Sequence, residues 1–298
     1  MTVRPRTTFK CRTNLVAYLF LLPGLVFIAI VYVYPIIKLI PMSLQRIAIG
    51  KFTWVGLSNF RYLLFEDEIV HQAVFNNIRL LLGIPVIIVL ALLLAALLYE
   101  RVRGVSFYQA IILLPYILSI PVAGLVMRVM LRSDGAINQA FQSIGFPGLA
   151  QNWLGSSNLA IWSLLAVIVW RELGMGVALF LAELLTLDEE VLDAGMVDGA
   201  SWFQRLRFIS IPHLRTIIGF YTTYLVIVIF SWTFSYVFVM TNGGPGFSTT
   251  VIEFSIYRYA VNKNMPHMAA ALSLLLFLAM FILIWVQFRI RRGLIERT

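Results

Sequence analysis

The chain has 298 residues, of which 60% are hydrophobic and 12% are charged, and its mean hydropathy is +0.89. A water-soluble domain of this length does not carry so much apolar surface, so the composition excludes a soluble globular protein and indicates a membrane protein. The formal net charge of +9 is spread thinly along the chain, which is typical of membrane topology and contact with anionic lipid and not of nucleic-acid binding.

Six apolar runs are long enough to cross the hydrocarbon core as helices, which takes roughly 20 residues each. They cover residues 15–34, 80–99, 107–131, 159–185, 217–240 and 268–288. None alternates with period two, so a β-barrel is not expected. The sequence therefore predicts an all-α polytopic membrane protein, with six transmembrane helices in a single domain over residues 1–298.

Basic residues are concentrated in the segments that six spans place on one side. These segments carry Arg4, Arg6, Lys10, Arg12, Arg101, Arg103, Arg205, Arg207, Arg215, Arg289, Arg291, Arg292 and Arg297. Cytoplasmic segments of membrane proteins carry such an excess. Both termini are therefore expected in the cytoplasm, and the first span is expected to be a retained signal anchor.

Two adjacent charged residues, Arg171 and Glu172, stand in the middle of the fourth predicted span. A charge at the centre of a span costs about 2.5–3.5 kcal/mol on insertion scales, so such residues usually have partners. Glu172 is expected either to form an ion pair or hydrogen bond within the helix bundle, or to hydrogen-bond a hydroxyl-rich substrate.

The polar segment between the fourth and fifth spans, residues 187–212, is expected to form a short helix, a turn and a second short amphipathic helix. Asp198-Gly199 is a turn signal, because glycine bends where a Cβ would clash. Pro212 suits the first turn of the helix that follows. A short amphipathic helix fits a groove on a partner protein or is held by lipid alone.

Aromatic residues recur along the fifth predicted span. Tyr221, Tyr224 and Trp232 lie at near-helical spacing. Their rings would suit a path for the apolar faces of sugars, but ordinary helix packing and interfacial placement are the favoured explanation.

The sequence has no pattern that would bind a nucleotide or a metal. Its Gly50-Lys51 pair continues with Phe52 and is not a phosphate-binding loop. His71, His213 and His267 lie in three different loops, so no metal site is expected. No nucleophile–base arrangement is found either, and the chain is not expected to be an enzyme.

The 187–212 segment also carries a motif with fixed register. Asp193-Ala194-Gly195 stands where a known pattern has E-A-A, Gly199 stands at its glycine, and Ile209 and Pro212 stand at its closing I-x-L-P. With this motif the chain resembles the inner-membrane permease subunits of binding-protein-dependent ABC importers, in the carbohydrate-uptake branch. Two outer segments agree: Asp134–Asn138 resembles the family's D-G-x-x-N, and 241–245 resembles its T-x-G-G-P.

The resemblance implies a fold, a set of partners and a location. The 187–212 segment would be the coupling helix that contacts an ATPase subunit, through Asp193, Ala194, Gly195, Asp198, Gly199, Ala200, Ile209 and Pro212. Two ATPase subunits would bind ATP and Mg, a second permease would complete the pore, and a periplasmic or surface-tethered solute-binding protein would deliver the substrate. The chain itself would hold no cofactor and would lie in a bacterial inner membrane.

The implied substrate is a sugar or sugar derivative. Glu172, Arg171, Tyr221, Tyr224 and Trp232 are the candidate residues of its path. The alternative is a stand-alone, ion-coupled secondary transporter, a class that tends to show inverted repeats and midplane carboxylates. Only Glu172 would serve as such a carboxylate, and no repeat is evident.

Overall fold

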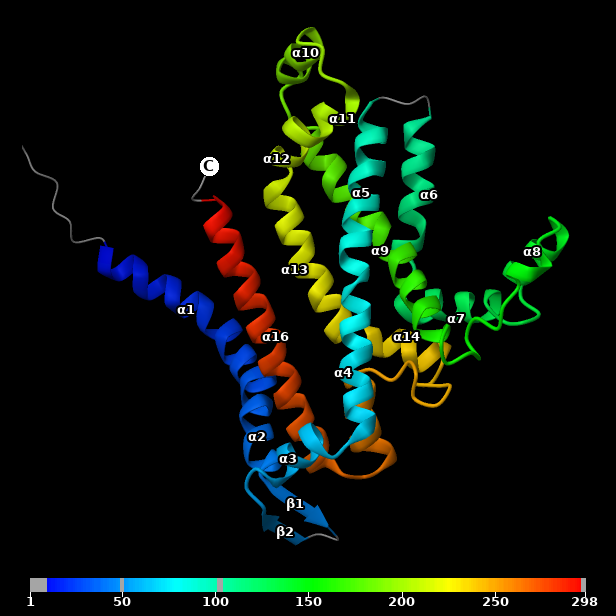
Figure 1. The fold of residues 1–298 in the computed structure, drawn as a ribbon. Coiled ribbons are helices and arrows are strands. Elements are labelled where there is room, and N and C mark those ends of the chain that lie inside the picture. Colours follow the sequence, from blue (N-terminus) through cyan, green and yellow to red (C-terminus); the bar gives the residue numbers. More distant parts are fainter. Residues whose placement is uncertain (1–9, 49–50, 101–103, 296–298) are drawn as a thin grey trace, which may run out of the picture.

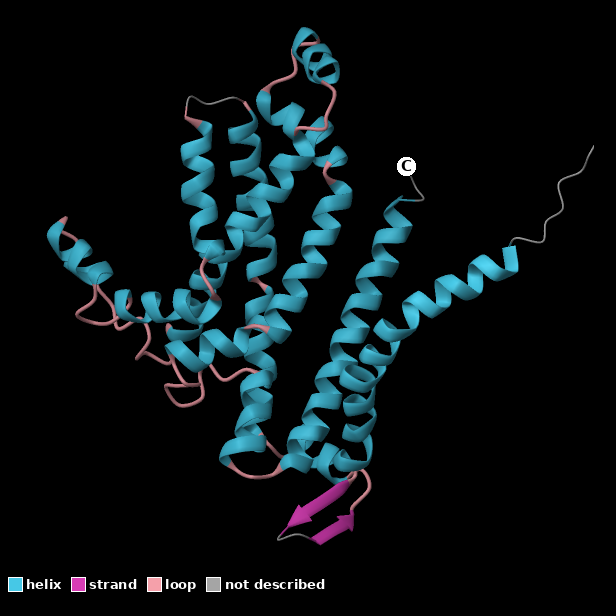
Figure 2. Ribbon diagram, turned by 180° about the vertical axis from the view of Figure 1, so that it is seen from behind, coloured by secondary structure: helices cyan, strands magenta, loops and turns pink. Residues whose placement is uncertain are grey.

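A computed structural model describes residues 10–48, 51–100 and 104–295. Over these residues the chain is helical apart from one two-stranded hairpin (Figures 1 and 2). The elements of the first half of the chain are α1 (Lys10–Ile28), η1 (Ala29–Val33), α2 (Tyr34–Ser43), β1 (Gln45–Ala48), β2 (Lys51–Trp54), α3 (Ser58–Phe65), α4 (Glu68–Leu81), α5 (Gly83–Tyr99), α6 (Val105–Ile117) and α7 (Ile120–Met130).

The remaining elements include the longest helices and several short ones. They are α8 (Ala136–Ser143), η2 (Pro147–Leu149), α9 (Ala160–Leu184), α10 (Glu189–Val197), α11 (Trp202–Arg205), η3 (Leu206–Ser210), α12 (Ile211–His213), α13 (Arg215–Ser231), α14 (Thr233–Met240), α15 (Ile252–Tyr257), η4 (Arg258–Asn262) and α16 (Pro266–Ile295).

Four continuous helical stretches among the described residues are long and apolar enough to cross a membrane. They are Tyr18–Ser43, Glu68–Tyr99, Ala160–Leu184 and Pro266–Arg289. The predicted first, second, fourth and sixth spans lie largely within these stretches, and the first and second continue further on one side. Two further helix pairs are bent, Val105–Ile117 with Ile120–Met130 and Trp202–His213 with Arg215–Ser231, and counting each pair as one span brings the number of candidate spans to as many as six.

The prediction of one continuous helix over residues 107–131 is wrong. α6 and α7 are bent by 100° at a break between them. Leu118 and Ser119 are extended there, with ψ of 139° and 146°. Pro121 follows at once in the first turn of α7, and proline is favoured where a helix begins.

The predicted fifth span, residues 217–240, is not one helix either. α13 ends at Ser231, and α14 begins after Trp232 in a different direction (Figure 1). α14 lies beside α7, and Gly124 of α7 faces Val239 and Met240 of α14. The third and fifth predicted spans therefore break at neighbouring places, and the helices beyond the two breaks, α7 and α14, pack on each other.

The core lies where α5, α9 and α13 meet, and small residues let these helices approach closely. A Cβ on Gly176 of α9 would lie 2.8 Å from the Cβ of Ala91 and 2.7 Å from the ring of Tyr221. A Cβ on Gly174 would lie 2.5 Å from the backbone oxygen of Ile112 in α6. Small residues at helix contacts are the usual packing device of membrane helices.

The two ends of the helix bundle differ. The 187–212 segment lies at one end together with the end of α5 and the start of α6, and the last described residues of α16 point toward the same end (Figure 1). The β1–β2 hairpin lies at the opposite end, with Gln45 paired to Trp54 and Ala48 paired to Lys51.

Candidate functional site

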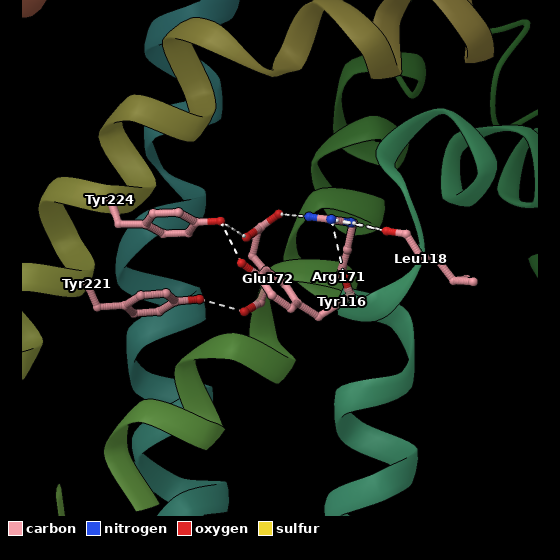
Figure 3. A network of polar contacts seen from close by, with 6 residues as sticks. All are labelled: Tyr116, Leu118, Arg171, Glu172, Tyr221 and Tyr224. Carbon is pink, nitrogen blue, oxygen red and sulfur yellow. Dashed lines mark hydrogen bonds and ion pairs between the residues drawn. The ribbon is translucent and has the colours of Figure 1, made fainter. Parts of the chain in front are cut away.

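A polar network lies within the bundle, centred on Arg171 and Glu172 of α9 (Figure 3). Nη1 of Arg171 lies 2.5 Å from Oε1 of Glu172, and the two side chains are 8% and 0% exposed. The two charges therefore pair with each other inside the helix bundle, which is the first of the two roles expected for Glu172.

The guanidinium of Arg171 also reaches the break between α6 and α7. Its Nε and Nη2 donate to the carbonyl of Leu118 at 3.3 and 3.1 Å, and Nη2 donates to the carbonyl of Tyr116 at 3.2 Å. The guanidinium also lies over the Tyr116 ring, 4.9 Å from its centroid. Tyr116 and Leu118 are not among the residues that the sequence predicts for the site, because no local pattern marks a carbonyl that a distant arginine will contact.

Two tyrosines of α13 complete the network (Figure 3). The hydroxyl of Tyr221 donates to the backbone carbonyl of Glu172 at 2.5 Å. The hydroxyl of Tyr224 lies 3.4 Å from Oε2 of Glu172 and 3.1 Å from the hydroxyl of Tyr116. The network therefore joins α6, α9 and α13.

Trp232 is not part of this network. It lies at the junction of α13 and α14, and its side chain is half exposed. Of the five candidate path residues, the structure brings together Arg171, Glu172, Tyr221 and Tyr224.

The 187–212 segment folds as a helix, a turn and a short helix. Asp198 ends α10, and Gly199 follows with φ +77°, a left-handed conformation that glycine adopts without strain. The amide of Ala200 donates to the carbonyl of Gly195, and the amide of Gly199 donates to that of Met196. These two hydrogen bonds form a Schellman C-terminal cap, which favours glycine where Gly199 stands.

The second helix starts with a capping box. The Ser201 hydroxyl accepts from the amide of Gln204, and the Gln204 side chain accepts from the amide of Ser201. The S-x-x-Q spacing of Ser201 and Gln204 is the sequence signal for this helix start. Pro212 lies in the first turn of α12, immediately before α13.

Side chains hold the segment in shape and fix it to the bundle. Nη1 of Arg205 donates to the carbonyl of Ala200, and Nη2 lies 3.3 Å from Oε1 of Glu100 at the end of α5. Gly195 packs against Ile209 and Arg205, so its small size allows α10 to approach the chain that follows the turn.

A cavity of about 820 Å³ lies between this segment and the ends of α5, α6 and α9. Leucines from α9 and α10 make up much of its wall, and Asp193 and Arg205 supply charged groups. Of the predicted coupling residues, Asp193 faces this cavity, and the turn contains Asp198, Gly199 and Ala200.

At the opposite end, two asparagines of α4 hold the chain that follows α14. Nδ2 of Asn76 donates to the carbonyl of Thr250 at 2.9 Å, and Oδ1 of Asn77 accepts from the amide of Ile252 at 2.9 Å. Nδ2 of Asn77 lies 3.4 Å from Oε2 of Glu253. The other carboxyl oxygen of Glu253 is buried without a partner among the described residues, and burial raises the pKa of Glu253 to about 7.

Asn138 organises the loop after α7. Its Nδ2 donates to the carbonyls of Arg132, Ser133 and Gln151, and its Oδ1 accepts from the indole of Trp153 at 2.8 Å. This explains why the D-G-x-x-N pattern ends in asparagine, since an amide both donates and accepts.

Known proteins are similar to this sequence over most of its length. No family model matches the chain. A probable ABC transporter permease of Pyrococcus horikoshii is 30% identical over 272 residues, which cover 89% of this chain and 92% of the relative. The chain belongs to the permeases of ABC transporters. Membership in this family does not favour the alternative of a stand-alone secondary transporter.

Other permease relatives have a substrate in their names. The lactose transport system permease LacF of Rhizobium radiobacter is 28% identical over 293 residues, which cover 97% of this permease and 98% of the relative. The sn-glycerol-3-phosphate transport system permease UgpA of Escherichia coli is 28% identical over 287 residues, with 95% and 96% covered.

Solved structures agree with the fold of this permease. A chain of a bacterial ABC transporter that imports the acidic polysaccharide alginate superposes with a TM-score of 0.82 at 22% identity, with 95% of this chain and 96% of that chain covered. A chain of a bacterial alginate ABC transporter in complex with a periplasmic protein that binds an alginate pentasaccharide gives a TM-score of 0.83 at 22% identity, with 97% of this chain and 98% of that chain covered.

Proposed function

We propose that this permease is the membrane subunit of an ATP-driven importer and forms half of a translocation pathway for a sugar or sugar derivative. Family membership supports the importer subunit, and the names of the lactose and glycerol-phosphate relatives support the substrate class. In this proposal α6 with α7 forms one span and α13 with α14 forms another, so the chain crosses the membrane six times, with both termini in the cytoplasm.

The 187–212 segment is the proposed contact with the ATPase subunit, through Asp193, Ala194, Gly195, Asp198, Gly199, Ala200, Ile209 and Pro212. The observation that carries this proposal is its rigid helix–turn–helix, closed by the Schellman cap and the capping box. Val197 is 86% exposed and Phe203 is 61% exposed beside the turn, so the bend presents apolar side chains for a partner's groove.

ATP and Mg are bound by partner subunits in this proposal. ATP shifts the equilibrium between inward-facing and outward-facing states through its different affinity for the two. A shift from 1:99 to 99:1 takes about 5.5 kcal/mol. The permease contributes a stiff connection between the ATPase and the spans.

The proposed substrate path runs along Tyr224 and Trp232, which keep part of their surface exposed. Arg171, Glu172 and Tyr221 lie behind this surface, since their side chains are buried in polar bonds. A second permease completes the path, and a periplasmic or surface-tethered solute-binding protein delivers the substrate at the end opposite to the 187–212 segment.

Uptake into proteoliposomes tests the proposed function. The permease is reconstituted with its second permease and ATPase subunits, and uptake is followed with the binding protein added outside. We expect uptake that requires ATP and is unchanged by an ionophore. Uptake that the ionophore abolishes and that proceeds without ATP would refute the importer.

A further inference from the structure

The break between α6 and α7 creates a local problem for a membrane span. A helix end leaves its last four carbonyls without intrahelical partners. An unsatisfied backbone group in the hydrocarbon core costs several kcal/mol, because no water reaches it. Tyr116 and Leu118 carry two such carbonyls, at and just beyond the last turn of α6.

Arg171 satisfies both carbonyls with one side chain. Three donor contacts run from its Nε and Nη2 to the carbonyls of Tyr116 and Leu118. A cation at the C-terminal end of a helix is also favoured by the helix dipole. Arginine suits this position because its donors form a rigid planar fork, which the single ammonium of lysine lacks.

Glu172 neutralises the buried cation and connects it to α13. It accepts from Nη1 of Arg171 on one oxygen, and its other oxygen faces the Tyr224 hydroxyl. The 187–212 segment joins α9 to α13, so both helices that leave this segment meet again at the network (Figure 3).

We propose that Arg171 is a positioning residue that caps the broken end of α6 and holds the 100° bend, with Glu172 fixing its orientation, and that neither side chain contacts the substrate. Through α9 and α13 the pair transmits displacement of the 187–212 segment to the bend. This last step rests on the proposed importer function, whereas the cap does not.

Distance measurements between spin labels report the bend directly. Cys11→Ser removes the single cysteine, and cysteines replace Phe107 of α6 and Val126 of α7, which are both exposed. A straight helix would separate these positions by about 29 Å, and the bent pair brings them closer. We expect a narrow distribution at the shorter distance for the full chain in nanodiscs.

An exchange of the two charges separates a helix cap from a simple ion pair. Arg171→Glu combined with Glu172→Arg keeps the pair and the net charge but moves the guanidinium about 100° around α9, away from the two carbonyls. We expect a broad distribution that extends to longer distances. A narrow distribution like that of the wild type would overturn the proposal, since an ion pair would then suffice.

Arg171→Lys provides the second variant if the exchanged chain does not insert. Lysine keeps the charge but has a single nitrogen to replace the guanidinium nitrogens that contact Tyr116, Leu118 and Glu172. We expect a distance distribution broader than that of the wild type. An unchanged distribution in this variant would also overturn the proposal. The matched control exchanges the exposed pair Arg132 and Asp134, which should leave the distance unaltered.

The reconstituted transporter tests the transmission step. In the exchange variant we expect transport to fall about tenfold or more while ATP hydrolysis continues, because a charge-assisted hydrogen bond contributes about that factor or more. The binding-protein concentration for half-maximal ATPase activity should be unchanged. A raised half-maximal concentration with normal maximal transport would indicate a substrate contact and overturn the positioning role. Absence of ATP-driven uptake in the wild type would instead refute the importer and leave the distance result standing.

Discussion

Gly199 is the residue on which the shape of the 187–212 segment depends most directly. Its φ of +77° is the left-handed conformation that costs an L-residue roughly 1–2 kcal/mol. A Cβ at this position would meet no atom within 4 Å, so the cost of a substitution is backbone strain and not a clash. The Schellman cap would loosen, and the angle between α10 and α11 would no longer be fixed.

We therefore predict that Gly199→Val leaves the permease inserted and assembled but uncouples transport, so that ATP is hydrolysed without substrate uptake. Gly199→Asn should be milder, because asparagine tolerates the left-handed region better than valine. Parallel measurement of ATPase activity and substrate accumulation checks this expectation. Gly145→Val is the matched control, since Gly145 also has a positive φ and open space. Normal accumulation in Gly199→Val would contradict the coupling role.

Glu253 should make the local stability of α15, at the other end of the molecule, depend on pH. Its pKa of about 7 in the folded chain lies above the ordinary value of 4.5, because burial disfavours the charged carboxylate. Glu253 therefore binds its proton more tightly when α15 is folded than when it is locally unfolded. The free energy of local unfolding falls as the pH rises from about 4.5 to 7, and it stays constant above pH 7.

Hydrogen exchange of α15, corrected for intrinsic rates, should show less protection at pH 8 than at pH 5. Glu253→Gln should remove this difference, because an amide carries no charge at either pH. Glu66→Gln, at an exposed position, should keep the wild-type response. Equal protection of wild-type α15 at both pH values would contradict the assignment.

At the level of helices, the sequence predicts what is local and misses what is tertiary. The fourth predicted span, 159–185, agrees closely with α9 because its whole apolar run is one helix. The turn at Asp198-Gly199 follows from glycine, and the pairing of Arg171 with Glu172 follows from the cost of an isolated charge. The breaks in the third and fifth spans depend on partners far along the chain, such as Arg171 for α6 and α7 for α14. No pattern within the broken spans indicates these partners.

The contact between α6 and α9 predicts a large effect from a small substitution. We expect Gly174→Ala to lower the stability of the permease by about 1–3 kcal/mol, as overpacking typically does, because the added methyl would meet backbone atoms of α6. Thermal unfolding in detergent measures this change. Gly24→Ala in α1 is the control, since a Cβ there meets nothing within 4 Å, and it should be neutral or slightly stabilising. An unaltered transition in Gly174→Ala would mean that α6 and α9 have room to separate.

At the scale of the whole molecule, the structure puts the 187–212 segment and the β1–β2 hairpin at opposite ends (Figure 1). The excess of arginine and lysine favours a cytoplasmic location for the first. The exposed apolar surface is also large, and the stretch Tyr18–Ser43 has none of its most apolar window buried within the chain. Lipid or the proposed second permease must cover it.

Cysteine labelling in cells tests this orientation. In the Cys11→Ser background, we predict that a membrane-impermeant maleimide labels Phe52→Cys in intact cells and labels Val197→Cys only after permeabilisation. Both positions are exposed in the structure, so access depends on the side of the membrane. Labelling of Val197→Cys in intact cells would put the segment outside, away from ATP, and would refute the importer topology.

Arg205 holds the 187–212 segment through two bonds that respond differently to dissolved ions. Its partner Glu100 is 46% exposed, so that ion pair weakens as salt screens it. Its bond to the carbonyl of Ala200 joins residues only five apart and moves with them. Raised ionic strength should therefore weaken the contact between the 187–212 segment and α5, while the bend of the segment stays intact. The attachment of the segment to α5 is therefore more sensitive to salt than the internal structure of the segment.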